Sequence, residues 1–330
     1  MQATVLGAGV IGGGWAARFV LHGWDVVVYD HDPNTAVHLE KTLARARQAL
    51  RELYDADLPP EGELSYATTL TEAIQGADWV QESVPESAEV KRAVYANLQN
   101  LLPADAVLAS STSGFKPSDL AQALSCAPQM LVCHPFNPVY LLPAVEVVAG
   151  RNTNSATQQR AHAVLTEIGM YPVAVRREID AHIADRLLEA LWREALWLVA
   201  DDVATTAEID DVMRYGFGLR WAQMGLFETY RIAGGEAGMH HFLKQFGPAL
   251  AWPWSKLTDV PDLNAELIDK IATQSDQQSG HLSISALEQQ RDNNLVALLR
   301  ALKQTDSGAG KLINLVDIAL QSRTTDLSHR

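Results

Sequence analysis

The sequence is poor in cysteine, since only Cys126 and Cys133 occur among its 330 residues. Two cysteines without a CxxC spacing exclude a disulfide framework and give no indication of a zinc site. The chain also lacks an apolar run long enough to span a bilayer. It opens on "QATVLGAG", without the basic and long apolar segments of a secretory signal. We therefore expect a cytoplasmic protein with no membrane-spanning segment.

Positive charge is scarce as well. Lysine and arginine total 26 against 40 aspartate and glutamate residues, which gives a formal net charge of -14. Nucleic-acid binding requires clustered lysine and arginine opposite the phosphates, so the balance argues against a nucleic-acid partner. It is compatible with a small cationic or zwitterionic ligand. With 47% hydrophobic residues, the chain can build cores for about two domains.

The first half of the sequence alternates between strand and helix patterns. Short apolar runs predict strands, and helical segments lie between most of them. The expected strands cover residues 3–7, 25–30, 77–84, 106–110, 130–134, 144–150 and 171–176. Such alternation is typical of an α/β domain with a predominantly parallel sheet and helices on both faces.

The pattern changes near residue 180. Residues 183–202, "IADRLLEALWREALWLVADD", carry apolar side chains at three- and four-residue spacing, as one long amphipathic helix does. The segments that follow are helix-like, without a convincing strand. We therefore predict an N-terminal α/β domain over residues 1–178 and an all-α C-terminal domain over residues 179–330.

A glycine-rich turn follows the first expected strand. In "VLGAGVIGGGWAARF" three glycines have the G-x-G-x-x-G spacing, and an aspartate ends the next strand. This context is typical of a Rossmann-type dinucleotide fold. There the first glycine permits the turn, the second admits the pyrophosphate, and the third lets helix and strand pack closely. The predicted cofactor-binding residues are Gly7, Ala8, Gly9, Val10, Ile11, Gly12 and Asp30.

Asp30 indicates the type of cofactor. Its carboxylate would accept hydrogen bonds from the adenosine ribose hydroxyls and would repel a 2′-phosphate. No arginine follows it directly, so we predict NAD rather than NADP. The alternative is a glycine-rich strand-to-helix turn that binds no ligand.

The stretch "HPFNPVYLLPAVEVV" places a histidine and an acid at the borders of two expected strands. His134 ends its strand and should face the crevice outside the carboxyl ends of the strands, where open α/β sheets bind ligands. If the next strand lies beside it, Glu146 can reach the imidazole. Such a pair can take up a hydroxyl proton as hydride leaves the carbinol carbon. The alternative is a structural histidine with a surface acid; a metal site is less expected, because one histidine stands here without a ligand cluster.

A run of hydroxyl residues, "SSTSGFKPSDL", follows the strand 106–110 and reaches the same crevice. Ser113 and Ser118 could cap a helix starting near Pro117. One of the hydroxyls could instead hold a substrate oxygen, and local sequence does not decide between the two.

Five motifs together resemble the 3-hydroxyacyl-CoA dehydrogenase superfamily in order and spacing: "GAGVIGGGWA", "QESVPESAEVK", "ASSTSG", "HPFNPVYLLPAVEVV" and "ADRLLEALWREALWLV". The resemblance covers nearly the whole chain. It implies a Rossmann domain, a helical domain that mediates dimerisation, and NAD-linked oxidation of a 3-hydroxyl group. We therefore expect a homodimer.

The resemblance also implies roles for single residues. The family's catalytic histidine and its partner acid fall on His134 and Glu146, and the serine that binds the substrate oxygen falls on Ser113. The acid and lysine on the cofactor side fall on Glu86 and Lys91. Asn137 lies in the family's "FNP" motif and is expected to contact the substrate.

One position departs from the family pattern. Asp185 stands where the hydroxyacyl-CoA enzymes have asparagine. A negative charge is unhelpful for an acyl thioester and attractive to a quaternary ammonium group. The region after the second strand is also too short and too balanced in charge to bind CoA. The second half of the chain most resembles the carnitine-oxidising branch of the superfamily, so we expect L-carnitine as a small zwitterionic substrate. The alternative for Asp185 is an acid placed to favour the helix dipole.

A trimethylammonium group cannot donate N–H hydrogen bonds and is recognised by aromatic faces. The candidate cage residues are Phe136, Tyr140, Trp192 and Trp221, with core packing as the alternative for each. Arg220 is the candidate partner for the carnitine carboxylate. Some members of this branch carry a thioesterase-like domain. The 330 residues leave no room for one, so another protein is expected to consume the ketone.

Three other functions stay open. An L-gulonate or other hydroxy-acid dehydrogenase is the nearest, and a short-chain 3-hydroxyacyl-CoA dehydrogenase follows. A non-enzymatic NAD-binding protein is the third, against which the set of His134, Glu146 and Ser113 argues.

Overall fold

The computed structural model describes residues 1–233, 238–246, 255–256, 262, 264–279 and 281–328. Its contacts define two units. The first comprises Met1–Asp185, Asp292–Arg300 and Leu312–Arg330, and the second comprises Arg186–Arg291 and Ala301–Lys311. The division made from the sequence placed all of residues 179–330 in one domain. In the structure, two C-terminal segments group with the first unit instead.

Buried polar contacts hold these C-terminal segments to the first unit. The Tyr140 hydroxyl donates to Asp292, and the backbone N–H groups of Asp55 and Ala56 donate to Asp317 Oδ1 at 2.9 and 3.1 Å. Both acceptor aspartates are buried. Because buried carboxylates are found with partners, these contacts fix where each segment packs. Amphipathic spacing identifies the helices but carries no information about such distant partners.

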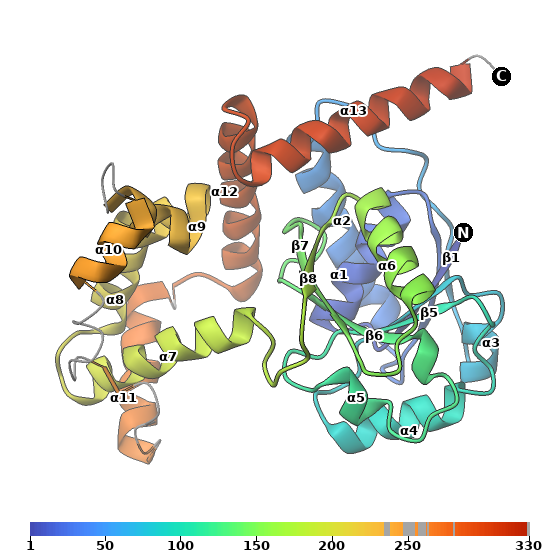
Figure 1. Ribbon diagram of the computed structural model, residues 1–330, viewed down its shortest axis with the longest axis horizontal. Coiled ribbons are helices and arrows are strands. Elements are labelled where there is room, and N and C mark those ends of the chain that lie inside the picture. The colour runs from blue at the N-terminus through green and yellow to red at the C-terminus, as the bar shows by residue number, and fades with distance from the viewer. Residues whose placement is uncertain (234–237, 247–254, 257–261, 263, 280, 329–330) are drawn as a thin grey trace. The chain divides into compact units, whose positions relative to one another are not determined.

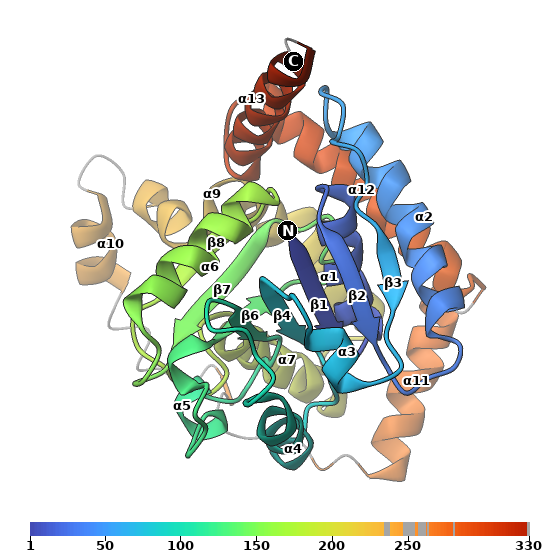
Figure 2. The ribbon, with the colours of Figure 1, turned by 90° about the vertical axis from the view of Figure 1, so that its right-hand side faces the viewer.

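The first unit is built on an eight-stranded sheet in the order β3-β2-β1-β4-β5-β6-β7-β8. Figure 2 shows β1 inside the sheet, with β2 and β3 to one side and β4, β6 and β7 to the other. The strands are β1 Gln2–Leu6, β2 Asp25–Tyr29, β3 Leu64–Tyr66, β4 Trp79–Glu82, β5 Val107–Ser110, β6 Met130–Pro135, β7 Ala144–Ala149 and β8 Tyr171–Val175. The sequence missed β3, which has only 3 residues and shows no alternation.

Every neighbouring pair of strands is parallel except β6 with β7. The connection between these two strands is short, whereas a parallel pair would need a crossover of about a dozen residues or more. The antiparallel pairing therefore follows from the length of this loop. The predicted fold, a Rossmann-type domain with a predominantly parallel sheet followed by a helical region, is confirmed.

Helices cover both faces of the sheet in the first unit (Figure 1). On one face α1 packs Trp15 and Phe19 in an aromatic group with Trp24 and Trp79. On the other face α3, α4 and α5 share a buried cluster that includes Leu6, Val80 and Leu108. The helices are α1 Val10–Leu21, α2 Thr35–Leu53, α3 Leu70–Ile74, α4 Ala88–Leu98, α5 Pro117–Leu120 and α6 Ser155–Glu167, with a short 3₁₀ turn at Ala127–Gln129.

The regular structure described in the second unit is helical. Its helices are α7 Ala184–Ala200, α8 Thr206–Val212, α9 Gly218–Ala233, α10 Gly238–Phe246 and α11 Ala265–Ser279, with a π-helical turn at Met213–Phe217. Helices α12 Ile284–Gln304 and α13 Ala309–Ser328 contribute residues to both units. Of the helices the structure describes, none combines the length and the apolar composition needed to cross a membrane.

Candidate active site

The glycine-rich turn joins β1 to α1 in a form that leaves room for a ligand. Gly7 has φ +83°, a conformation that glycine adopts without strain. A Cβ at Gly12 would lie 1.8 Å from the Gly7 carbonyl oxygen. A Cβ at Gly9, by contrast, would meet no atom of the described residues within 4 Å beyond its chain neighbours. Gly7 and Gly12 are therefore required by the fold itself, whereas Gly9 borders open space.

Helix α1 starts beside this open space. Gly9 is its N-cap and supplies no side-chain hydrogen bond, and the first turn contains no acidic residue. The first N–H groups of a helix lack intrahelical partners, and the helix dipole adds positive potential there. The turn therefore offers a site for an anion such as a pyrophosphate. Ala8 belongs to this turn, and Val10 and Ile11 begin α1; their contact with a cofactor stays a prediction.

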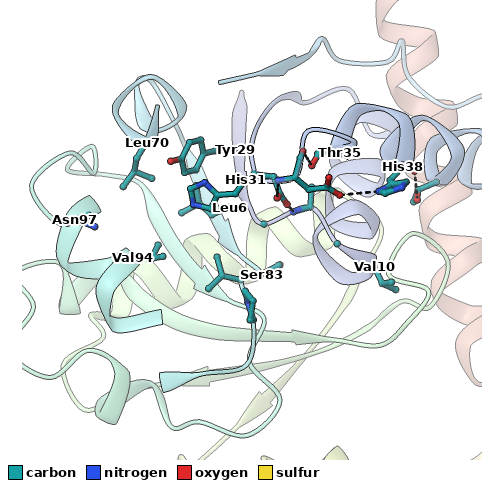
Figure 3. A pocket seen from close by; sticks show the side chains of 18 of the residues that line it. Leu6, Val10, Tyr29, His31, Thr35, His38, Leu70, Ser83, Val94 and Asn97 are labelled. Atoms are coloured by element: carbon teal, nitrogen blue, oxygen red, sulfur yellow. Dashed lines mark hydrogen bonds and ion pairs between the residues drawn. The ribbon is translucent and has the colours of Figure 1, made fainter. Parts of the chain in front are cut away.

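The turn opens onto a cavity of about 1040 Å³. In Figure 3, Tyr29, Leu70 and Asn97 lie toward one end of the cavity, and Thr35 and His38 lie toward the other. The cavity sits outside the carboxyl ends of β1, β2 and β4, where the strand order reverses. Doubly wound sheets bind dinucleotides at this point.

Asp30 lies at the edge of the cavity, directly after β2. Its Oδ2 accepts the Ala8 N–H at 2.6 Å, and its Oδ1 accepts the Asp32 N–H at 2.8 Å. Each carboxylate oxygen can accept more than one hydrogen bond, so the ribose hydroxyls of a dinucleotide can still be bound. Lys41 and Arg45 of α2 also line the cavity. The prediction of NAD rested on the absence of an arginine directly after Asp30, and these two cations lie further along the chain.

His134 and Glu146 form a buried pair across β6 and β7. They stand opposite each other in the antiparallel register, and His134 Nδ1 lies 2.8 Å from Glu146 Oε2. A carboxylate can only accept, so Nδ1 carries the proton and Nε2 keeps its lone pair in the neutral ring. Glu146 Oε1 accepts the N–H groups of Ile183 and Ala184 at 2.9 and 3.0 Å, at the start of α7.

These hydrogen bonds determine the charge of Glu146. Burial alone would raise its pKa, but the hydrogen bonds from His134 and from the backbone N–H groups of Ile183 and Ala184 hold the pKa below the usual carboxyl range. Glu146 is therefore ionised at neutral pH. It can fix the orientation of the imidazole and stabilise its protonated form.

The stability of the protein should depend on this carboxylate in a pH-dependent way. Because the folded-state pKa is depressed, its contribution is present above the unfolded-state pKa and is lost as the pH falls through the folded-state pKa. We expect Glu146→Gln to lower the free energy of unfolding by about 1–3 kcal/mol at neutral pH. The difference in the free energy of unfolding between Glu146→Gln and wild type should become smaller at acidic pH.

Urea unfolding at neutral and at acidic pH measures this change. Glu89→Gln, which alters an exposed acid on α4, is the matched control and should show no comparable pH-dependent gap. An equal loss for Glu146→Gln at both pH values would contradict the expectation.

Ser113 lies in the loop between β5 and α5 and is partly buried. Helix α5 has Lys116 as its N-cap and no side-chain capping bond, so neither Ser113 nor Ser118 caps it. Ser118 Oγ instead accepts the Arg151 N–H at 2.8 Å. Of the two roles left open for these serines, helix capping is therefore excluded by the structure.

A network of ion pairs and hydrogen bonds connects Lys91 of α4 to the Ser113 loop. Lys91 Nζ lies 2.8 Å from Glu82 Oε1 and 3.2 Å from Glu86 Oε2. The Thr112 hydroxyl and the Gly114 N–H in turn donate to Glu86 Oε1. Lys91 and Glu82 are fully buried and Glu86 is exposed. The two predicted cofactor-side residues, Glu86 and Lys91, thus share one network with the loop.

Two buried hydroxyl residues, Tyr95 and Ser110, also belong to this network. Both hydroxyls donate to Glu82 Oε2. Burial, and next the charge of Glu82, raise the pKa of Tyr95, so it remains a neutral donor. Glu82 is a charged residue within an apolar strand pattern, but its role, like that of Tyr95, is visible only in the folded structure.

The remaining predicted residues of the first unit differ in how close they lie to His134. Asp185 Oδ1 is 4.0 Å from His134 Nε2, and the Phe136 and His134 ring centroids are 5.6 Å apart. Asn137 is exposed in the same loop. Tyr140 is buried and bonded to Asp292, which favours the alternative of core packing over a cation cage.

Trp192, Arg220 and Trp221 belong to the second unit. Trp192 is largely exposed and borders a cavity of about 60 Å³ between α7, α8 and α11. Arg220 is exposed, and Trp221 packs on Phe217 with ring centroids 4.6 Å apart. Their contact with a substrate stays a prediction.

One residue near His134 was missed altogether. His182 is fully buried, and its ring centroid lies 5.7 Å from that of His134. It lies in the segment between β8 and α7, where neither strand nor helix periodicity applies. Only the presence of a histidine in "DAHIADRLL" could have drawn attention to it.

Two family models match successive parts of this chain. Residues 2–179 match the model described as "3-hydroxyacyl-CoA dehydrogenase, NAD binding domain". Residues 182–270 match the model described as "3-hydroxyacyl-CoA dehydrogenase, C-terminal domain". The first match includes the glycine-rich turn and the His134–Glu146 pair.

Two curated relatives are similar over most of the chain. A Ruegeria pomeroyi protein named L-carnitine dehydrogenase/betainyl-CoA thioesterase is 56% identical over 321 residues, which cover 97% of this chain and 66% of that protein. The chain thus spans about two thirds of that relative's length. A Mesorhizobium japonicum L-carnitine dehydrogenase is 52% identical over 310 residues, which cover 94% of this chain and 85% of the relative.

A solved structure resembles the fold of nearly the whole chain. It is a 5-formyl-3-hydroxy-2-methylpyridine 4-carboxylic acid 5-dehydrogenase, described as an NAD⁺-dependent dismutase. The TM-score is 0.76 at 27% identity, covering 92% of this chain and 98% of the other.

Proposed function

Because the chain belongs to the 3-hydroxyacyl-CoA dehydrogenase family, we propose that it is an NAD-dependent dehydrogenase that oxidises the 3-hydroxyl of L-carnitine to 3-dehydrocarnitine. The observation that carries the proposal is the buried His134–Glu146 pair with Asp185 beside it. The relatives named as L-carnitine dehydrogenases support the choice of substrate.

The geometry of the pair suits the removal of a hydroxyl proton. Glu146 holds the His134 tautomer with the proton on Nδ1, so Nε2 can accept the proton of the substrate hydroxyl. A bound nicotinamide supplies the acceptor for the hydride that leaves the carbinol carbon. Glu146, and at longer range Asp185, then stabilise the imidazolium. Ser113 is proposed to donate a hydrogen bond to the substrate oxygen.

The cofactor site fits a dinucleotide on three independent grounds. They are the open space at Gly9, the uncapped start of α1, and the size of the cavity beside Asp30. We propose NAD rather than NADP because the Asp30 carboxylate would repel a 2′-phosphate. The positive charges of Lys41 and Arg45, which line the same cavity, would instead attract a 2′-phosphate. Both NAD and NADP therefore belong in the first assay.

That assay measures reduced cofactor by its absorbance at alkaline pH, because oxidation releases a proton. L-carnitine is compared with D-carnitine, L-gulonate and 3-hydroxybutyryl-CoA, each with NAD and with NADP. Turnover confined to L-carnitine with NAD is the expected result. Activity on a different hydroxy acid would keep the proposed chemistry of His134 and reject the substrate. Cofactor binding without turnover on any of them would reject the enzyme.

Asp185 is proposed to attract the trimethylammonium group of the substrate. Its carboxylate lies near His134 Nε2, where the substrate hydroxyl must be held. An exposed or half-exposed charge pair contributes up to about 1 kcal/mol, so Asp185→Asn should raise the KM for L-carnitine by about fivefold. The KM for NAD should stay the same.

A neutral isostere of carnitine, with tert-butyl in place of trimethylammonium, separates this effect from a change at His134. The KM for the isostere should not rise in Asp185→Asn. An equal rise for both compounds, or no rise for carnitine, would show that Asp185 does not recognise the cation.

We also propose that the protein acts as a homodimer. The second unit exposes large apolar side chains on its helices, among them Leu187, Trp192, Phe227 and Ile232, and exposed apolar patches mark interaction sites. Light scattering coupled to gel filtration should give twice the chain mass of 36.1 kDa. Phe227→Glu should shift the protein toward the monomer, whereas Val37→Glu, on α2 of the first unit, should not. A monomeric wild type would reject this proposal.

A further inference from the structure

The segment that leads from β8 into α7 has an unusual backbone. Ala181 and His182 both have positive φ, +61° and +47°, although neither is glycine. Successive left-handed residues persist only where the surroundings hold them. Here the Ala181 N–H donates to the Gly114 carbonyl at 3.0 Å, and Glu146 Oε1 accepts the N–H groups of Ile183 and Ala184. The segment is therefore tied to the Ser113 loop on one side and to the His134–Glu146 pair on the other.

This backbone places the His182 side chain between the same two features. Its Nε2 lies 3.3 Å from the Thr112 carbonyl oxygen, and its ring centroid lies 5.7 Å from that of His134. A carbonyl oxygen can only accept, so Nε2 carries the proton and donates. Nδ1 is then the unprotonated nitrogen. It is buried and has no hydrogen-bond partner among the residues that the structure describes.

The charges around His182 come from three elements. They are His134 on β6, Glu146 on β7 and Asp185 on α7. Burial, and next the charge of His134, lower the pKa of His182, whereas its hydrogen bond to the Thr112 carbonyl and the charges of the two carboxylates act in the other direction. The two neighbouring imidazoles therefore have different environments. His134 is bonded to a carboxylate and His182 to a neutral carbonyl.

We propose that His182 is a positioning residue for the oxidation: its neutral imidazole holds the Thr112–Ser113 backbone against His134, so that Ser113 and the base meet the same substrate hydroxyl. His134 is then the sole imidazole of this pair that takes up the substrate proton. This role of His182 rests on the proposed function, because its effect on kcat can be measured only if the protein oxidises the substrate.

Two variants of His182 separate positioning from packing. His182→Phe keeps a planar ring but cannot donate to Thr112. His182→Gln can place an amide N–H where imidazole Nε2 lies. We expect His182→Phe to lower kcat by about 30-fold, within the range for misplaced catalytic groups. The KM for NAD should change less than about twofold, since no contact of His182 with the cofactor cavity is expected. His182→Gln should recover most of this loss.

Folding is checked by thermal unfolding of each variant. His182→Phe removes the unpartnered Nδ1 acceptor and also the donor to the Thr112 carbonyl. These two changes have opposite effects on stability, so the melting temperature should stay within about 5 °C of wild type. The pH dependence of kcat/KM should keep its acidic limb in both variants, because His134 remains the base. Loss of that limb in His182→Phe would make His182 the base and overturn the inference. Unchanged kcat in His182→Phe, or no recovery in His182→Gln, would also overturn it.

A measurement without substrate keeps the inference separate from the proposed function. In ¹⁵N NMR of imidazole-labelled protein, the neutral Nε2–H tautomer of His182 should persist at neutral pH, assigned by its loss in His182→Gln. A protonated His182, or the Nδ1–H tautomer, would overturn the inference whether or not carnitine is oxidised. If the wild type oxidises none of the tested alcohols, the proposed function fails and the NMR result still decides the state of His182.

Discussion

Replacement of His134 by glutamine should lower kcat for alcohol oxidation by about 10²–10⁴-fold, the usual contribution of a general base. The glutamine amide can occupy similar space and still meet Glu146, but it cannot accept the hydroxyl proton. NAD affinity should be preserved because the cofactor cavity is lined by other residues. Steady-state oxidation of L-carnitine and NAD titration of tryptophan fluorescence measure the two effects.

His162→Gln is the matched control, because His162 lies on α6 and has no proposed role in the site. It should retain wild-type kcat. The wild-type kcat/KM for oxidation should also fall at acidic pH, since only the neutral imidazole can accept a proton. A flat profile, or a His134→Gln variant that keeps a tenth of the activity, would reject the histidine base.

The two glycines that flank the start of α1 should respond in opposite ways to alanine. In Gly12→Ala the new Cβ would lie 1.8 Å from the Gly7 carbonyl oxygen, so strand and helix must move apart. Overpacking of this kind costs typically about 1–3 kcal/mol and occasionally more. We expect a melting temperature lower by about 5–10 °C and little NAD binding. Differential scanning calorimetry and NAD titration measure both.

Gly9→Ala is the partner experiment, because its Cβ would enter open space. It should melt within about 2 °C of wild type, yet bind NAD about tenfold more weakly because the methyl group occupies the approach of the pyrophosphate. Wild-type NAD affinity in Gly9→Ala would show that no phosphate lies against this turn. Wild-type stability in Gly12→Ala would contradict the close packing of α1 on β1.

The parts of the fold that could be predicted from sequence are those fixed by local patterns. The glycine spacing is imposed by backbone contacts at Gly7 and Gly12, and the longer strands by runs of apolar residues. The three-residue strand β3 carries too little pattern to be seen. The return of two C-terminal segments to the first unit depends on single long-range partners such as Asp292 and Asp317, which periodicity does not report.

In the candidate site too, the features set by local sequence could be predicted and those set by distant partners could not. The end of its strand predicted that His134 faces a crevice, and Glu146 was expected to reach it only if the next strand lay beside the first. The antiparallel register that sets the two residues opposite each other follows only from the sheet. Glu82 and Tyr95 escaped notice because their roles arise from burial next to Lys91. His182 escaped because its position depends on left-handed backbone geometry that an Ala-His pair does not suggest.

The two oxygens of Glu146 serve different parts of the chain, and this constrains how the protein can be engineered. Oε2 meets His134, and Oε1 meets the backbone of Ile183 and Ala184. A chimera that joins this Rossmann domain to a relative's helices at residue 178 would exchange the backbone that Glu146 binds. A junction placed after Asp185 would transfer the helices while leaving both partners of this carboxylate in their native chain. A junction for exchanging the helices that begin the second unit is therefore better placed inside the first turn of α7, seven residues beyond the boundary that the sequence suggests.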